Sequence, residues 1–146
     1  MILILLGCPE PPAMIPCSLY LINKLKKKNF KILVSGNHAA LKLLDVADIE
    51  RYYLKGVGCV DIDEGLKELK GVEKIISFVH NDGGVSYTIT YKSNYNVETL
   101  AILFGKRINL EFKKTLEEYG VKVHPVRAFH NPTPIVKVID KIVEGF

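Results

Sequence analysis

The sequence predicts an α/β protein built on a mainly parallel sheet of about six strands, covered by helices on both faces. Three observations carry this prediction. Short apolar runs alternate with longer segments of helical periodicity along the 146 residues, and such alternation is typical of βα units. The length suits one domain, which we expect to span residues 1–146. Right-handed crossovers leave 3-2-1-4-5-6 as the most economical strand order, a Rossmann-like three-layer α/β/α sandwich.

The six predicted strands are short, apolar runs rich in β-branched residues. They cover about residues 2–6, 31–35, 59–62, 74–79 and 99–104, with a sixth run that starts at Val121. In the predicted order the sheet changes its direction of growth between the first and fourth strands. Ligands bind outside the carboxyl ends of the strands at such a switch point, so we expect the site there.

The helices of the first half follow their strands in turn. The first is expected over about 16–28, with Pro16 well placed in its first turn. The second follows Asn37, a good N-cap. Residues at helical spacing are expected to face the core: Leu19, Ile22 and Leu25 in the first helix, and Leu41, Leu44 and Ala47 in the second.

Further helices are predicted from their caps and breakers. One is expected over about 64–70 after Asp63, and another over about 110–119, where Gly120 suits a C-terminal cap. The last helix follows Asn131 and Pro132. Its inward positions are Ile135, Val138, Ile139 and Ile142.

Residues 85–93 carry two conflicting signals. Strict alternation and β-branched side chains from Val85 to Tyr91 favour a strand. Parallel neighbours on either side, however, need a crossover of about a dozen residues, which is usually a helix. We therefore predict a helix.

Composition excludes several classes of protein. Hydrophobic residues make up 48% and charged residues 25%, which is ordinary for a globular domain. The apolar start of the chain meets Pro9, Pro11 and Pro12, so it is too short to span a bilayer and lacks the basic flank of a signal peptide. We expect a cytoplasmic protein without a membrane partner. Seventeen Lys against three Arg, with no Gln, weakly favour a heat-loving source.

Cysteine and lysine usage is informative mainly by exclusion. Cys8, Cys17 and Cys59 lack CxxC spacing, which argues against disulfides and structural zinc, and we predict no metal site. Cys59 opens a strand and is expected in the core, whereas Cys17 lies near a helix N-terminus that favours a thiolate. The lysine-rich run 24–31 suits the negative end of a helix dipole. Phe30 is the one aromatic residue in this run, and a single ring does not form the series of stacking platforms typical of nucleic-acid binding, so we predict no nucleic-acid partner.

Three of the four histidines sit beside an asparagine where a predicted strand ends. The pairs are Asn37-His38, His80-Asn81 and His130-Asn131. The loop that holds Cys8 and Glu10 follows the first strand in the same way. Polar groups on such loops often face a ligand, so we predict that these pairs and Glu10 contact a small molecule. The remaining histidine, His124, precedes Pro125 in a strand and is expected to be structural.

The predicted centre of the site lies at the switch point. Cys8, His80 and Asp82 are the candidate catalytic groups, because they can serve as thiolate, acid or base. Gly83 and Gly84 form a candidate anion nest with Asp82. With strands about 4.8 Å apart, the loops of the second and sixth strands are roughly 19 Å apart, which places His38 and His130 at the margins.

Other interpretations remain open at these positions. Each asparagine stands where a helix begins, so capping accounts for it without a ligand. The first turn lacks GxGxxG, and its prolines remove N–H donors for a pyrophosphate. No Walker A, HExxH or GxSxG motif occurs in the sequence. The cofactor therefore stays unknown, and whether the protein is an enzyme stays uncertain.

Three segments are distinctive in combination: residues 7–12 (GCPEPP), 80–87 (HNDGGVSY) and 130–134 (HNPTP). Together they resemble a family of uncharacterised proteins from methanogenic archaea. The resemblance covers nearly the whole chain and implies a three-layer Rossmann-like sandwich in a methanogenesis-associated setting. It implies no catalytic residues, because the family has no assigned activity.

Two functions follow from these observations. The first is binding of a small molecule at the strand ends, with or without catalysis. The second is a non-catalytic accessory or regulatory protein that acts through protein contacts, and on either reading a homo-oligomer is expected. In the second case each histidine would bond a backbone carbonyl and each asparagine would cap a helix.

Overall fold

A computed structural model describes residues 1–67 and 69–146. Within these residues, six strands form one sheet in the order β3-β2-β1-β4-β5-β6, and neighbouring strands are parallel. The strands are β1 (Ile2–Leu6), β2 (Ile32–Gly36), β3 (Gly58–Asp61), β4 (Lys74–Val79), β5 (Glu98–Gly105) and β6 (Lys122–Arg127). The predicted strand order and parallel sheet are confirmed.

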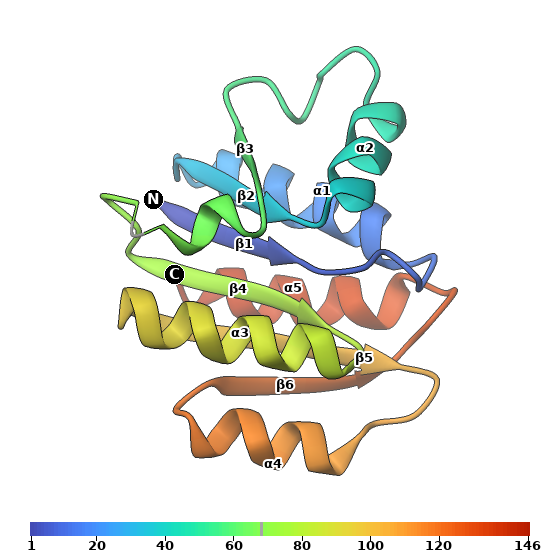
Figure 1. Cartoon of the computed structure of the whole chain (residues 1–146). Helices are drawn as coiled ribbons and strands as arrows, with labels where there is room; N and C mark the ends of the chain where they lie inside the picture. The colour runs from blue at the N-terminus through green and yellow to red at the C-terminus, as the bar shows by residue number, and fades with distance from the viewer. Residues whose placement is uncertain (68) are drawn as a thin grey trace.

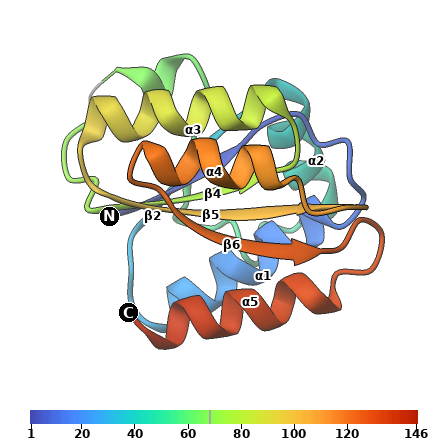
Figure 2. The ribbon, with the colours of Figure 1, turned by 90° about the horizontal axis from the view of Figure 1, so that it is seen from below.

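Helices cover both faces of this sheet (Figures 1 and 2). They are α1 (Met14–Lys27), α2 (His38–Ala47), α3 (Asp82–Tyr95), α4 (Leu110–Glu118) and α5 (Thr133–Glu144). Seen along the sheet, α3 and α4 lie on one side and α1 and α5 on the other (Figure 2). The three-layer α/β/α architecture follows. None of the helices in the described part of the chain is long and apolar enough to cross a membrane.

The alternation of β1 explains how the layers are held together. Ile2, Ile4 and Leu6 pack into the cluster formed with α1 and α5, whereas Leu3 and Leu5 pack into a cluster with Tyr91 of α3 on the opposite face. All five side chains of β1 are buried. A strand buried on both faces has the continuous apolar sequence seen here, because successive side chains point to opposite faces.

The ambiguous segment is helix α3, as predicted. Asn81 caps its start, and Asn96 closes it in the left-handed conformation at φ 50°. The hydroxyls of Thr88 and Thr90 donate to the carbonyl oxygens four residues earlier, at 2.7 and 2.9 Å. These bonds let threonines of high strand propensity satisfy their hydroxyls within a helix. The crossover between parallel strands therefore decides the structure over local alternation.

Four expectations for the β2–β4 region are wrong. The helix expected over 64–70 is a single turn of 3-10 helix, η1 (Glu64–Leu66), and Asp63 does not cap it with its side chain. Ala47 is exposed, and Ala40 takes its place as a core residue of α2. Cys59 is exposed because β3 is the edge of the sheet.

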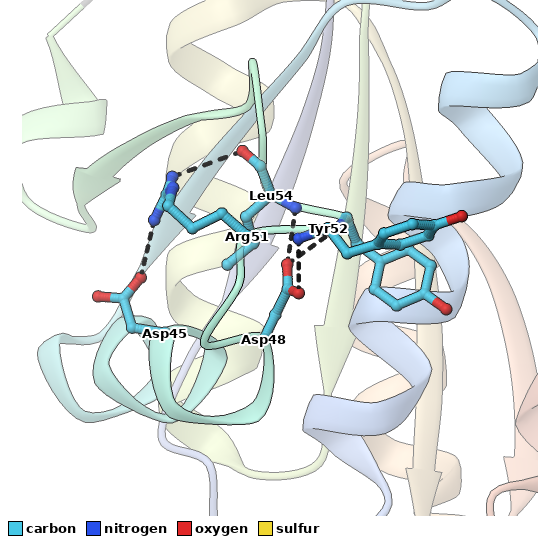
Figure 3. A network of polar contacts seen from close by, with 6 residues as sticks. Asp45, Asp48, Arg51, Tyr52 and Leu54 are labelled. Atoms are coloured by element: carbon cyan, nitrogen blue, oxygen red, sulfur yellow. Dashed lines mark hydrogen bonds and ion pairs between the residues drawn. The ribbon is translucent and has the colours of Figure 1, made fainter.

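The connection between α2 and β3 is organised around one carboxylate (Figure 3). Asp48 is buried and accepts hydrogen bonds from the backbone N–H groups of Tyr52, Tyr53 and Leu54 at 2.8–2.9 Å. Burial on its own would raise the pKa of Asp48. The three N–H donors and the nearby Arg51 guanidinium outweigh burial, so the pKa lies below its ordinary value.

The lysine-rich run forms the end of α1, as predicted, and two of its side chains donate hydrogen bonds to backbone carbonyl oxygens of other segments. Lys26 donates to the carbonyl oxygens of Tyr53 and Lys55 at 2.9 and 2.8 Å. Lys28 donates to the carbonyl oxygen of Val143, at 2.7 Å, near the C-terminus. These lysines therefore fasten neighbouring segments to the end of α1.

Candidate functional site

The asparagines at the strand ends act as helix caps. The side-chain oxygen of Asn37 accepts from the N–H of Ala39, and that of Asn81 accepts from the N–H of Gly84. The oxygen of Asn131 accepts from Thr133 at the start of α5. The capping interpretation is confirmed for Asn37 and Asn81. The N-cap of α5 is Pro132 instead, and Asn131 bonds the first helical N–H from one position earlier. Contact of the three pairs with a ligand stays a prediction.

His80 joins the loops that follow β1 and β4. Its Nε2 lies 2.6 Å from the carbonyl oxygen of Cys8. A carbonyl can only accept, so Nε2 carries the proton in this bond. The imidazole ring of His80 also packs against the ring of Phe104 at the end of β5, with 5.7 Å between the ring centroids. The bond orients the imidazole and also fixes the backbone of the Cys8 loop.

The predicted catalytic trio is only partly assembled. Cys8 meets His80 through its backbone carbonyl, and its side chain is exposed. Asp82 is the first residue of α3 and is exposed. It therefore lies at the helix N-terminus, where the helix dipole stabilises a carboxylate. Among the described residues, no hydrogen bond or ion pair joins Asp82 to His80. The helix-dipole role accounts for Asp82, and a catalytic role for the trio stays a prediction.

The nest predicted from Gly83 and Gly84 is the first turn of α3 rather than a loop. The N–H of Gly84 is already bonded to Asn81. A Cβ at Gly84 would lie 3.3 Å from Cγ1 of Val79, so the helix starts close against β4. Close packing at the helix start is therefore one reason for glycine here.

A pocket of about 570 Å³ opens at the carboxyl ends of β4, β5 and β6. It is displaced from the β1–β4 switch point towards the β6 edge. Three predicted site residues line it: Glu10, His80 and Asn81. The other lining residues are Leu103, Phe104, Gly105, Lys106, Arg107, Ile108, Asn109, Phe112 and Phe129. Cys8 and Asp82 lie outside this lining, as do His38 and His130, which are exposed.

The basic and aromatic residues of this pocket were not among the predicted site residues. Lys106 and Arg107 directly follow the buried strand β5, and this position was the available signal. Lys106 Nζ lies 4.8 Å from the ring centroid of Phe129, in the loop after β6. His130 packs its ring against Phe129 from outside the pocket, with centroids 4.8 Å apart. The contact couples His130 to the site without placing it in the lining.

Hydrogen bonds tie the loops around the pocket to one another. His80 bonds the β1 loop, and the N–H of Ala13 in that loop donates to the carbonyl oxygen of Phe129 at 3.0 Å. The N–H of Ala128 donates to the carbonyl oxygen of Gly105 at 3.0 Å. The loops after β1, β4, β5 and β6 are therefore linked in series, and a site built on them is pre-organised.

The start of α1 is not arranged to hold a phosphate. Pro11, Pro12 and Pro16 have no N–H. The N–H groups of Ala13 and Met14 are bonded to Phe129 and Pro11. Phosphate sites at helix N-termini depend on free N–H groups, and here most of those donors are missing or used.

Cys17 lies just inside α1 and is buried. Its Sγ is 3.7 Å from the carbonyl oxygen of Pro132. Burial raises the pKa of its thiol to about 11. The predicted tendency towards a thiolate is wrong, because loss of solvent outweighs the helix dipole.

No three metal-ligating side chains converge among residues 1–67 and 69–146. His38 begins the helix after β2, and His130 lies in the loop after β6; three strands separate β2 from β6 in the sheet.

A family model described as a domain of unknown function, DUF1890, matches residues 3–142. The chain belongs to this family. An uncharacterised protein of Methanocaldococcus jannaschii is 59% identical over 142 residues, which are 97% of this chain and 96% of the relative. The resemblance to uncharacterised proteins of methanogenic archaea is thereby confirmed.

Two solved structures have a fold similar to that of this chain. The structure of a protein designated MT0777 is 38% identical and has a TM-score of 0.91, over 98% of this chain and 96% of that one. A dodecameric FMN-dependent UbiX-like decarboxylase from Escherichia coli O157:H7 is 15% identical with a TM-score of 0.63, over 100% of this chain and 94% of its own. At that identity the second likeness concerns the fold alone.

Proposed function

We propose that this DUF1890 protein binds a small molecule in the pocket at the carboxyl ends of β4, β5 and β6. The observation that carries the proposal is the pocket itself, whose walls come from loops tied together by hydrogen bonds. Its volume of about 570 Å³ is within the usual range of ligand sites. Strand ends of a parallel sheet are also where α/β proteins bind ligands.

The lining suits recognition of a compact, partly apolar molecule. Phe104, Phe112 and Phe129 supply apolar walls, and Asn81 and Asn109 sit among them. The side-chain oxygens of both asparagines accept capping hydrogen bonds from helix N–H groups. Their amide N–H₂ groups therefore remain as donors. Glu10 and His80 add one acceptor and one titratable ring. The proposal is one of binding, and the acid–base roles of Cys8, His80 and Asp82 stay predictions.

The likeness to a flavin enzyme does not extend the proposal to flavin. The residues at the start of α1 do not fit a phosphate, because most of their N–H groups are absent or bonded. We therefore derive no step through a flavin and leave the cofactor unassigned.

The experiment is retention of a small molecule from a methanogen cell extract, followed by native and denaturing mass spectrometry. We expect a stoichiometric extra mass that is lost on denaturation. Ile108 lines the pocket, whereas Leu110, two residues on, is 71% exposed and outside it. Ile108→Trp should prevent retention and Leu110→Trp should not. Equal retention by both variants would place the ligand elsewhere.

A second candidate function has its own observation. On α2 and the segment after it, Leu43, Val46, Ile49 and Tyr52 are 43–77% exposed, and the sheet edge β3 follows them in the chain. Exposed apolar side chains in one segment are typical of protein contacts. They support an accessory protein or homo-oligomer, for which Val46→Asp should lower the mass found by analytical ultracentrifugation. A monomeric parent would count against it. A cytoplasmic location and a role in methanogenesis also stay predictions.

A further inference from the structure

We propose that the molecule bound in this pocket is an organic anion with a flat apolar body. Its carboxylate or phosphate would pair with Lys106 and Arg107, and its body would lie against Phe129 and Phe104. The inference rests on the proposed binding function and names the class of ligand.

Charge at the pocket is the first step of the argument. Lys106 and Arg107 are adjacent, exposed and part of the lining, and Glu10 is the one acidic residue among the lining residues of the described chain. The ion pairs formed within residues 1–67 and 69–146 engage other cations, such as Lys24, Arg51 and Lys113. Two cations against one carboxylate give the pocket an excess of positive charge, which attracts anions.

The backbone next to these cations adds to the same field. Helix α4 begins at Leu110, directly after its N-cap Asn109, and Asn109 lines the pocket. The N-terminus of a helix carries a partial positive charge. The guanidinium of Arg107 has donors that match both oxygens of a carboxylate or phosphate.

The aromatic residues define the other half of the ligand. Lys106 Nζ lies over the ring of Phe129 at 4.8 Å from its centroid, so its charge and an apolar surface are presented together. Phe104 is 2% exposed and forms a rigid wall, because it packs on Phe78 with ring centroids 6.2 Å apart. A flat apolar body can stack on such surfaces while its anionic group reaches the two cations.

A ligand with one charge and a flat body also explains why the site lies over β5 and β6. At the start of α1, where a parallel α/β fold often holds a phosphate, most N–H donors are missing or already bonded. The excess of cations stands at the end of β5 instead. Carboxylates and phosphates share this chemistry, and only measurement distinguishes them.

The test is titration of the full chain with benzoate, phenyl phosphate and the neutral analogue benzyl alcohol, followed by amide NMR shifts. We expect one or both anions to shift the amides of Gly105 and Asn109, and to bind at least about tenfold more tightly than benzyl alcohol, a factor that corresponds to about 1.4 kcal/mol. Benzoate above phenyl phosphate identifies a carboxylate ligand, and the reverse identifies a phosphate.

Matched variants separate a specific contact from general charge. The double variant Lys106→Gln, Arg107→Gln should lose at least about tenfold in anion affinity. The control Lys114→Gln, Lys137→Gln removes two exposed charges outside the pocket and should bind as the parent does. Equal binding of benzyl alcohol and the anions, or unchanged anion binding in the double variant, would overturn the inference and leave the proposed function standing. Absence of shifts with both anions would also overturn it, and retention from extract would then decide the proposed function separately.

Discussion

The imidazole Nε2 of His80 donates a hydrogen bond to the carbonyl oxygen of Cys8, 2.6 Å away, and so joins the ends of the neighbouring strands β1 and β4. Both residues follow strands that border the switch point, and the sequence predicts them as chemical partners there. The structure gives them a structural connection through the backbone of Cys8. The bond also makes His80 part of the pocket wall with a fixed orientation.

This hydrogen bond predicts a loss of stability when His80 is replaced and a defined tautomer of His80 in the parent. We expect His80→Ala to lower the free energy of unfolding by about 0.5–1.5 kcal/mol, since one hydrogen bond with partial solvent exposure is lost. Chemical denaturation measures this loss, and Cys8→Ser, which keeps the carbonyl, is the control. In the parent, long-range ¹⁵N NMR at high pH should show the proton on Nε2. A proton on Nδ1 would contradict the hydrogen bond described here.

Tyr91 should be the most sensitive tyrosine of the chain to loss of its hydroxyl. Its side chain is fully buried, its hydroxyl donates to the carbonyl oxygen of Ile62, and Ser35 Oγ lies 2.5 Å from it. Tyr91→Phe removes this hydroxyl and leaves the Ile62 carbonyl and the Ser35 hydroxyl buried without their hydrogen bonds to it. The free energy of unfolding should then fall by about 1–3 kcal/mol. Tyr119→Phe is a matched control, because Tyr119 is 56% exposed. Equal unfolding midpoints for the two variants would show that the network contributes nothing.

The fold was predictable because its signals are local or topological. β1 and β4 are short apolar runs of one kind, and the limited ways of connecting parallel strands then define the order. Even α3, with its strand-like alternation, follows from the crossover that its neighbours require. The position of Cys59 was missed because burial at an edge strand depends on what lies beside it, which no residue of β3 encodes.

The candidate site was predictable only in part. Residues that cap helices and end strands have a sequence signature, so His80, Asn81 and Glu10 were found. Lys106 and Phe129 come together from loops after β5 and β6, and their contact depends on the directions of two side chains. Such directions follow from packing of the complete fold, not from the spacing of residues along the chain.

Asp48 should make the connection from α2 to β3 sensitive to acid. The pKa of Asp48 is lowered in the folded protein, so the unfolded chain takes up more protons in acid. The stabilisation is complete above the unfolded value of about 3.9 and is lost as the pH falls through the folded value. Asp48→Asn should lower the midpoint of thermal unfolding at pH 6 by several degrees and flatten its dependence on pH below about 4.

The control for this variant is Asp45→Asn. Asp45 is exposed and pairs with Arg51 at 3.4 Å, so its loss should change the midpoint little. Should Asp45→Asn be as destabilising as Asp48→Asn, the backbone bonds of Asp48 would not be what holds the connection.

His124 should give the protein a second dependence on pH, in a higher range. It lies in β6, and its Nε2 is buried without a partner among the described residues. Burial lowers the pKa of His124, and Lys122 and Lys141 lower it further. The folded state therefore binds fewer protons than the unfolded chain below the unfolded value of about 6.5. The free energy of unfolding should therefore be highest above that pH and decrease as the pH drops through the pKa of His124 in the folded protein.

The variant His124→Leu removes this titrating group. Its free energy of unfolding, measured by urea denaturation, should fall less between about pH 7 and pH 5 than that of the parent. The comparison is His130→Gln, at an exposed position. If His124→Leu and the parent kept the same slope, the burial of His124 would not govern stability in this range.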